Sequence, residues 1–283
     1  MAQAFEPPAM PANAHQVVRA PGAVTGIKQS RLSKATRDRI LQIGSPLGLL
    51  ALWEVIVLAG MVNSRFLPAP TQIIGSFWNL ASTGLLYLDL KASLYRILMG
   101  FVIGVVPGMV IGLSMGLFPI VRTIFDPVVS ATYPIPKLAL LPLFMLIFGL
   151  GNLEMILVIA SGAIYLVLIN TAAGVLEISQ IYWDVAKDLG ASWWDRFTTV
   201  ALPGALPLIF TGLKLSIGMA VLLIVAAESD GANHGVGFLI WRAYDIYDIK
   251  QMYVAFVLLS LMGYVFTVVL NEIERWLVKW RNV

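Results

Sequence analysis

Long apolar runs alternate with short polar segments from about residue 45 to the end of the chain. A helix needs about 20 mostly apolar residues to cross the hydrocarbon core of a membrane. Six runs approach that length, at Pro46–Val62, Ile97–Leu117, Val128–Leu150, Met155–Val175, Pro207–Ala226 and Met252–Leu270. The pattern therefore predicts an all-α integral membrane protein with six transmembrane helices.

Three of these runs carry residues that interrupt an apolar helix. The first contains Glu54, for which we expect a hydrogen bond to a neighbouring helix, and the fifth contains Lys214, which can snorkel to the membrane surface. The third is broken by three prolines between residues 134 and 142. Because irregular backbone at membrane depth is tolerated only away from lipid, Lys137 among these prolines is a candidate for lining the translocation path.

The second run carries a row of glycines at four-residue spacing. Small residues at this spacing let the backbone of another helix approach closely, so we expect tight helix packing along the row. A role in lining a substrate path is the alternative. The glycines of the row are Gly100, Gly104, Gly108, Gly112 and Gly116.

Two stretches between the runs have their own character. Thr71–Leu90 shows a moderate helical period and predicts a helix along the outer surface. Gly231–Tyr247 has glycines on both sides of His234, which indicates turns and a solvated histidine.

Composition agrees with a chain that is mostly embedded in lipid. Hydrophobic residues make up 59% and charged residues 12%, about half the charged share of an ordinary soluble domain. Residues 1–40 differ, since they are rich in Pro and Ala and hold six basic and two acidic groups. We interpret them as a disordered basic cytoplasmic tail that anionic lipid can attract, followed by a transmembrane domain at 41–283. The basic excess lies in this tail, so it does not indicate a nucleic-acid-binding face.

The placement of Lys and Arg sets the orientation, because these residues favour the cytoplasmic side. With the N-terminus inside, twelve basic residues fall on the inner side and five on the outer side. The outer five are Arg65, Lys91, Arg96, Arg242 and Lys250. Both termini are therefore predicted to be cytoplasmic, as is the polar segment at about 178–203.

Motifs of enzymes are missing from the sequence. It contains no GxxxxGK[ST] phosphate loop, no G-x-S-x-G elbow and no HExxH, and it has no cysteine and only two histidines. We therefore expect neither catalysis nor a bound cofactor or metal in this chain.

The segment at about 178–203 predicts a stiff lever at the cytoplasmic surface. Residues 179–189 can form a short helix that Gly190 ends, and Ser192 with Asp195 has the spacing of a capping box for a second helix. Pro203 fits the first turn of the next membrane helix. Four aromatic residues offer apolar surface for docking into a protein cleft: Trp183, Trp193, Trp194 and Phe197.

This segment resembles the coupling loop of permeases in ATP-binding-cassette importers. The family pattern is Glu-Ala-Ala, three residues, Gly, nine residues, an aliphatic residue, one residue and Leu-Pro. Every spacing holds here, although Asp184 stands for Glu and Val185 for Ala. By this resemblance, the residues that would contact the ATPase are Asp184, Ala186, Gly190, Ala191, Val200, Leu202 and Pro203.

The resemblance covers residues 45–283 and is strongest with the nitrate, taurine, alkanesulfonate and bicarbonate group of permeases. It rests further on Phe66–Pro70, Tyr133–Pro136, Gly149–Gly151 and Ala226–Glu228. It implies a type I importer fold in a bacterial inner membrane, a second copy of the chain, two ATPases that bind ATP and Mg²⁺, and a periplasmic or lipid-anchored binding protein. The solute stays open: a small anion is expected, and thiamine-pyrimidine precursors also fit permeases of this type.

Polar residues within the runs are candidates for the translocation path. Helix N-termini and uncharged polar groups suit an anionic cargo, and Glu228 at the outer end of the fifth run can anchor a gate or face the binding protein. These candidates are Lys137, Ser161, Thr211, Ser216 and Glu228. The rival hypothesis is an autonomous ion-coupled secondary transporter or channel, which would need acid or histidine relays deep within the spans.

Overall fold

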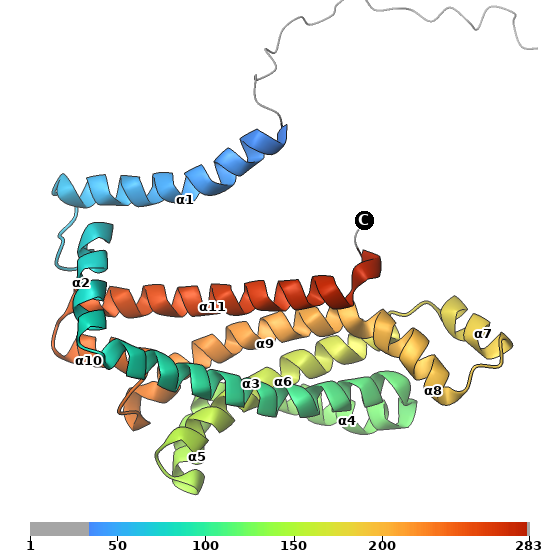
Figure 1. Cartoon of the computed structure of the whole chain (residues 1–283). Helices are drawn as coiled ribbons and strands as arrows, with labels where there is room; N and C mark the ends of the chain where they lie inside the picture. Colours follow the sequence, from blue (N-terminus) through green and yellow to red (C-terminus); the bar gives the residue numbers. More distant parts are fainter. Residues whose placement is uncertain (1–33, 282–283) are drawn as a thin grey trace, which may run out of the picture. The chain divides into compact units, whose positions relative to one another are not determined.

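Figure 1 shows the computed structural model of the chain, which describes residues 34–281. The chain divides into two compact units, residues 1–49 and 50–283, and each is described by itself. In the first unit the structure describes the beginning of α1 (Lys34–Leu58), which continues into the second unit. The predicted disordered tail lies outside the described residues up to residue 33, whereas residues 34–40 belong to α1.

Every element within residues 34–281 is helical. The second unit contains α2 (Pro70–Ser82), α3 (Leu85–Leu117), α4 (Pro119–Thr132), the 3₁₀ turn η1 (Lys137–Leu140), α5 (Leu141–Phe148), α6 (Asn152–Leu176), α7 (Gln180–Asp188), α8 (Trp193–Arg196), the π turn η2 (Phe197–Ala201), α9 (Leu202–Gly231), α10 (Val236–Asp245), α11 (Ile249–Leu277) and the 3₁₀ turn η3 (Lys279–Arg281). The all-α prediction is confirmed.

The number of spans differs from the six that the hydrophobic pattern predicted. Four helical stretches of residues 34–281 are long and apolar enough to cross a membrane: Leu85–Leu117, Asn152–Leu176, Trp193–Ser229 and Ile249–Leu277. A fifth is counted if α4 and the η1–α5 stretch, bent by 86°, form one broken span, and this bend falls at the prolines expected to break the third run. The first run does not qualify, because its apolar helix, Gly44–Leu58, is shorter than a membrane crossing requires.

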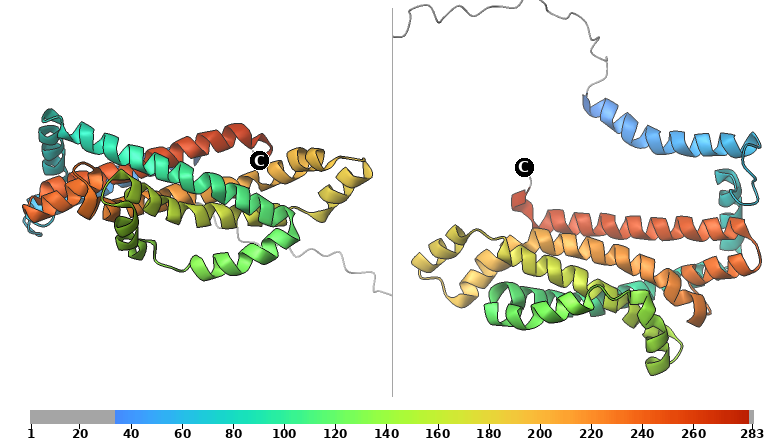
Figure 2. Two further views of the ribbon diagram at one scale, coloured as in Figure 1. Left: turned by 90° about the horizontal axis from the view of Figure 1, so that it is seen from below. Right: turned by 180° about the vertical axis from the view of Figure 1, so that it is seen from behind.

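The core of the second unit is a bundle in which α3, α6, α9 and α11 run alongside one another (Figures 1 and 2). α6 lies between α3 and α9 and is the most buried of the four. α7 and α8 lie at one end of the bundle and α10 lies at the other, as the views from opposite sides agree. We call these the lever end and the α10 end.

The α3–α6 contact is close because of the glycine row. A Cβ added at Gly104 would lie 2.5 Å from the carbonyl oxygen of Ala160, and one at Gly108 would lie 2.6 Å from that of Ile164. Gly100, Gly112 and Gly116 also face α6. The other side of α6 uses glycine too, since a Cβ at Gly174 would lie 2.9 Å from the carbonyl oxygen of Ala205 on α9. This second seam has no regular spacing, which is why the sequence analysis missed it.

α3 begins twelve residues before the predicted start of the second span. The outer helix expected at Thr71–Leu90 is two helices, because α2 ends at Ser82 and Gly84, with φ +74°, turns the chain into α3. The hydroxyl and backbone N–H of Thr71 at the start of α2 donate to the carboxylate of Glu54, at 2.7 and 3.1 Å. The hydrogen bond expected of Glu54 is therefore confirmed.

Candidate functional site

The 178–203 segment forms a helix–turn–helix at the lever end of the bundle. α7 ends at Asp188, and Gly190 two residues later has a φ of +73°, in the left-handed region that glycine favours. The N–H of Gly190 donates to the carbonyl oxygen of Lys187 and the N–H of Ala191 to that of Ala186, both at 2.9 Å. This pair of bonds is the Schellman motif, which satisfies carbonyl groups at a helix end and fixes the turn.

The second helix is capped as its sequence predicts. The Ser192 hydroxyl accepts from the N–H of Asp195 at 3.2 Å, and the Asp195 carboxylate accepts from the N–H of Ser192 at 3.0 Å. This reciprocal pair is a capping box, and it joins the turn after Gly190 directly to α8.

Pro203 lies in the first turn of α9, as the sequence predicts. α8 continues through η2 into α9, so that a single helical path runs from Trp193 to Ser229. A proline inside a helix leaves a carbonyl group one turn earlier without its N–H donor. A π turn changes the hydrogen-bond register locally, and η2 lies just before Pro203, where that change is needed.

Aromatic rings attach α8 to the corner between α3 and α4. Phe118 at this corner stacks on Trp193 with ring centroids 6.2 Å apart, and Trp193 stacks on Phe197 at 5.7 Å. Trp194 stays 61% exposed, whereas Trp183 packs inward near Val175. Of the four aromatic residues expected to dock into a partner, Trp194 is therefore the most available.

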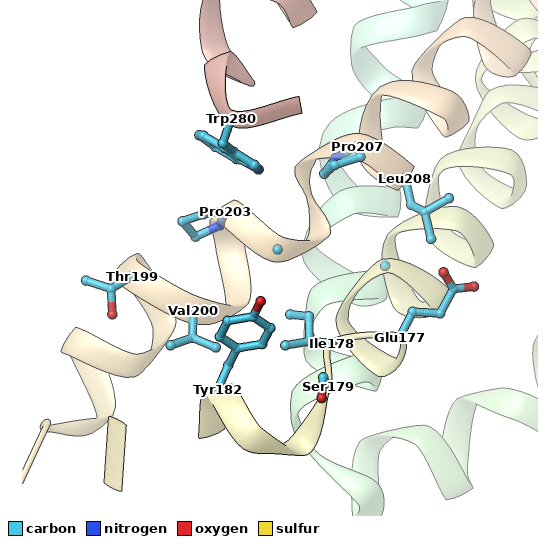
Figure 3. A pocket seen from close by; sticks show the side chains of 12 residues that line it. Glu177, Ile178, Ser179, Tyr182, Thr199, Val200, Pro203, Pro207, Leu208 and Trp280 are labelled. Atoms are coloured by element: carbon cyan, nitrogen blue, oxygen red, sulfur yellow. The ribbon is translucent and has the colours of Figure 1, made fainter. Parts of the chain in front are cut away.

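Two cavities flank the segment. One, of about 600 Å³, has Ile178 and Tyr182 on one side and Pro203 and Trp280 on the other (Figure 3). The second, of about 480 Å³, lies between the end of α3 and the two short helices and is lined by charged groups that include Asp184. The motif residues are spread around both: Val200 and Pro203 line the first cavity, Asp184 and Gly190 are exposed, and Ala186, Ala191 and Leu202 are half-buried.

The five candidates for the translocation path lie at separate places in the described part of the chain. The amine of Lys137 donates to the carbonyl oxygen of Thr132 at 3.0 Å and so caps the C-terminal end of α4. The same amine lies 4.2 Å from the ring centre of Tyr165. The hydroxyls of three others donate to carbonyl oxygens: Ser161 to Val158, Thr211 to Pro207 and Ser216 to Ala163.

These candidates also differ in exposure. Ser216 is fully buried between α9 and α6, and Thr211 is exposed on α9. Lys214, which was expected to snorkel, forms an ion pair with Glu274 of α11. The pairing links α9 to α11 at half-buried positions.

The fifth candidate, Glu228, belongs to a buried polar cluster at the α10 end. Its carboxylate accepts from Arg96 Nη1 at 2.6 Å and lies 2.8 Å from the hydroxyl of Ser93. Arg96 is therefore a buried residue of α3, not the loop residue that the charge count assumed. Asp89, Ser93 and Arg96 were not predicted as site residues from the sequence, although their spacing of four and three residues marks one helix face.

A bundle of apolar helices, one of which continues into a polar helix–turn–helix at the bundle end, is the architecture of a multi-pass membrane protein. A family model described as "Binding-protein-dependent transport system inner membrane component" matches residues 104–283. The chain belongs to this family. It is the inner-membrane permease subunit of such a system and not its ATPase.

Relatives match most of the chain. The putative aliphatic sulfonates transport permease protein SsuC of Bacillus subtilis is 35% identical over 84% of this chain and 86% of its own length. The taurine transport system permease protein TauC of Escherichia coli is 32% identical over 87% and 92%, and the nitrate import permease protein NrtB of Synechococcus elongatus is 32% identical over 69% and 73%. The resemblance to this group of permeases is confirmed.

The fold also matches a solved structure. A chain of the MetNI methionine ABC transporter, in an inward-facing conformation, aligns with a TM-score of 0.61 and 22% identity. The alignment covers 68% of this chain and 96% of that one. At this identity the likeness concerns the fold alone.

Proposed function

We propose that the chain imports a small anionic solute of the nitrate, sulfonate, taurine or bicarbonate class, driven by ATP hydrolysis in a partner. The names of three relatives, which refer to aliphatic sulfonates, taurine and nitrate, support this class. The proposed assembly has the type I fold with two copies of this chain, two ATPases that carry ATP and Mg²⁺, and a periplasmic or lipid-anchored binding protein. Both termini and the lever end face the cytoplasm.

The observation that carries the mechanism is the unbroken helical path from Trp193 to Ser229. The Schellman motif at Gly190, the capping box at Ser192 and the π turn make the 178–203 segment a stiff extension of α9. A partner that displaces this lever therefore displaces α9 as a rigid body, and α6 with it through their glycine-lined contact. ATP binding would draw the two levers together and open the bundle outward, and hydrolysis would return it.

One face of α9 is exposed within the described residues 34–281. Thr211, Leu215, Gly218 and Leu222 are exposed at spacings of four, three and four residues, which places them on one side of the helix. This face supports a path between two copies of the chain, with Thr211 as a polar group along it. Ser216 lies on the opposite, buried side of α9 and contributes to packing instead.

Family membership argues against the autonomous secondary transporter, because the family is defined by dependence on a binding protein. The test is reconstitution of the chain with its cognate ATPase and binding protein in liposomes. We expect ATP-dependent uptake of at least one of radiolabelled nitrate, taurine, ethanesulfonate and bicarbonate. Uptake that an ion gradient drives without the ATPase would overturn the proposal, and uptake of a pyrimidine precursor alone would overturn the anionic class.

A further inference from the structure

Three polar side chains of α3 are buried along one helix face at the α10 end. Asp89, Ser93 and Arg96 are 2%, 0% and 6% exposed, in a helix that is otherwise apolar along most of its length. Burial of such groups is costly unless each finds partners. Their partners are Glu228, near the end of α9, and residues 232–237, which comprise the link after α9 and the first two residues of α10 and are called the connection below.

The connection is held through three successive backbone N–H groups. The N–H of Gly235 donates to Asp89 at 3.0 Å, that of Val236 to the Ser93 hydroxyl at 2.8 Å, and that of Gly237 to Glu228 at 2.8 Å. The guanidinium of Arg96 completes the set, because Nη1 donates to the carbonyl oxygen of His234 at 2.7 Å as well as to Glu228.

Two glycines make this close contact possible. Gly235 has a φ of +150°, and a Cβ added there would overlap the carboxylate of Glu228. A Cβ at Gly237 would lie 3.0 Å from the same carboxylate and 2.9 Å from the Cα of Val225. The backbone of the connection therefore lies directly on the buried carboxylate, which is an approach that only glycine permits.

Glu228 and Arg96 each bind several partners within the protein. Glu228 accepts from Ser93, Arg96 and Gly237, while Arg96 also reaches Asn152 at the start of α6 through Nε, at 2.8 Å. An acid with this many donors and no exposed surface is poorly placed to contact a passing solute.

We propose that Asp89, Ser93, Arg96 and Glu228, together called the clamp, are positioning residues for transport. The clamp holds the 232–237 connection on α3. At this end of the bundle, α3, α9 and α10 therefore move as one body, while the lever moves the opposite end of α9. This inference rests on the proposed function and adds to it the residues that carry the motion across the bundle. The clamp stays closed through the cycle, because opening it would leave a buried arginine and a buried carboxylate without partners.

The test uses Glu228→Gln, Ser93→Ala and the double variant Arg96→Met/Glu228→Met, with Arg65→Gln, an exposed basic residue in the segment before α2, as control. Each is purified as the full complex with ATPase and binding protein. Hydrogen exchange of the peptide that covers 232–238 reports on the three held N–H groups. Uptake of the four radiolabelled anions and binding-protein-stimulated ATP hydrolysis are measured per assembled complex.

We expect the clamp variants to exchange the 232–238 amides at least tenfold faster and to lose at least tenfold in uptake per ATP hydrolysed. The double variant removes both charges, so it should assemble better than Glu228→Gln and still fail to couple hydrolysis to uptake. Arg65→Gln should match the wild type in both measurements.

Two outcomes would overturn the clamp. One is fast exchange at 232–238 with unchanged uptake per ATP, and the other is a loss of uptake that only follows the amount of assembled complex. Absence of ATP-driven uptake in the wild-type complex would instead count against the proposed function, so the two failures are distinguishable.

Discussion

Phe118 and Trp193 stack with their ring planes only 17° apart, which ties the corner between α3 and α4 to the first residue of α8. Phe118 is 42% and Trp193 49% exposed, so the stack lies at the surface of the lever end. It is the direct ring contact between the lever and the α3 side of the bundle. The lever is thereby braced from two sides, by its continuation into α9 and by this ring.

Replacing Phe118 with Ala should loosen this brace. An aromatic pair contributes about 0.5–1.5 kcal/mol beyond its buried area, which corresponds to a two- to tenfold change in an equilibrium. We therefore expect uptake per ATP hydrolysed to fall by roughly that factor in reconstituted complexes. Phe148→Ala, which breaks the Phe144–Phe148 pair away from the lever, serves as the control. Equal losses in the two variants would show that the brace has no special role.

Gly190→Val should uncouple movement of the lever from solute uptake. The substitution meets no steric obstacle, since no atom lies within 4 Å of the added Cβ, but it places a branched residue at φ +73°. The left-handed backbone costs about 1–2 kcal/mol for a residue with a side chain, which is enough to disturb the Schellman turn. We expect uptake per assembled complex to fall at least tenfold.

Gly84→Val is the matched control for this variant. Gly84 has the same left-handed backbone, φ +74°, and the same open surroundings, but it lies before α3 and far along the sequence from the lever. It should lower the yield of complex and leave uptake per complex near the wild-type value. If Gly190→Val also transports at the wild-type rate per complex, the rigid lever is wrong.

A disulfide between positions 178 and 204 should leave the transporter active. A Cβ at Gly204 would lie 3.9 Å from the Cβ of Ile178, within the range that disulfides require, and the chain has no cysteine of its own. Ile178 precedes α7 and Gly204 is in the first turn of α9, so the bond fixes the base of the lever. If the base moves as one piece, oxidised Ile178→Cys/Gly204→Cys should keep at least half of the wild-type uptake.

The measurement compares the oxidised and reduced forms of the same preparation. Uptake that disappears on oxidation and returns with reductant would show that Ile178 and Gly204 separate during the cycle. Such a result would place a hinge within the lever and contradict the rigid connection.

Gly104→Ala should destabilise the bundle. The added methyl group would meet the backbone of α6, at 2.5 Å from the carbonyl oxygen of Ala160, and overpacking of this kind costs about 1–3 kcal/mol. Gly263→Ala in α11 is the control, because nothing lies within 4 Å of its Cβ. Thermal unfolding in detergent should show a lower midpoint for Gly104→Ala and an equal or higher one for Gly263→Ala. Equal midpoints in the two variants would mean that α3 and α6 can move apart to admit the methyl group without loss of stability.

The sequence predicted the elements that local chemistry determines. The end of α7 before Gly190, the capping box at Ser192 and the break at the prolines of the third run all depend on residues close together in the chain. The glycine row was visible because its spacing matches the helical period. These features required no knowledge of distant contacts.

The misses involve residues that are far apart in sequence. Arg96 looks like a loop residue until Glu228, 132 positions later, supplies its partner. Lys214 pairs with Glu274, 60 positions later, and no local pattern indicated this partner. A polar residue in an apolar run has the same local signature whether it ends the helix or pairs across the bundle, so spacing alone could not decide.

The π turn between α8 and α9 has a consequence for insertions and deletions. Successive residues of a helix are rotated by about 100°, so one residue gained or lost between Arg196 and Leu202 would swing Trp193 and Trp194 around the axis relative to the faces of α9. Under the proposed mechanism, the aromatic surface would then point away from the ATPase, even with every side chain intact. The number of residues between Gly190 and the Leu-Pro pair thus determines which way the aromatic side chains face. Natural variation in this segment should replace residues without changing their number.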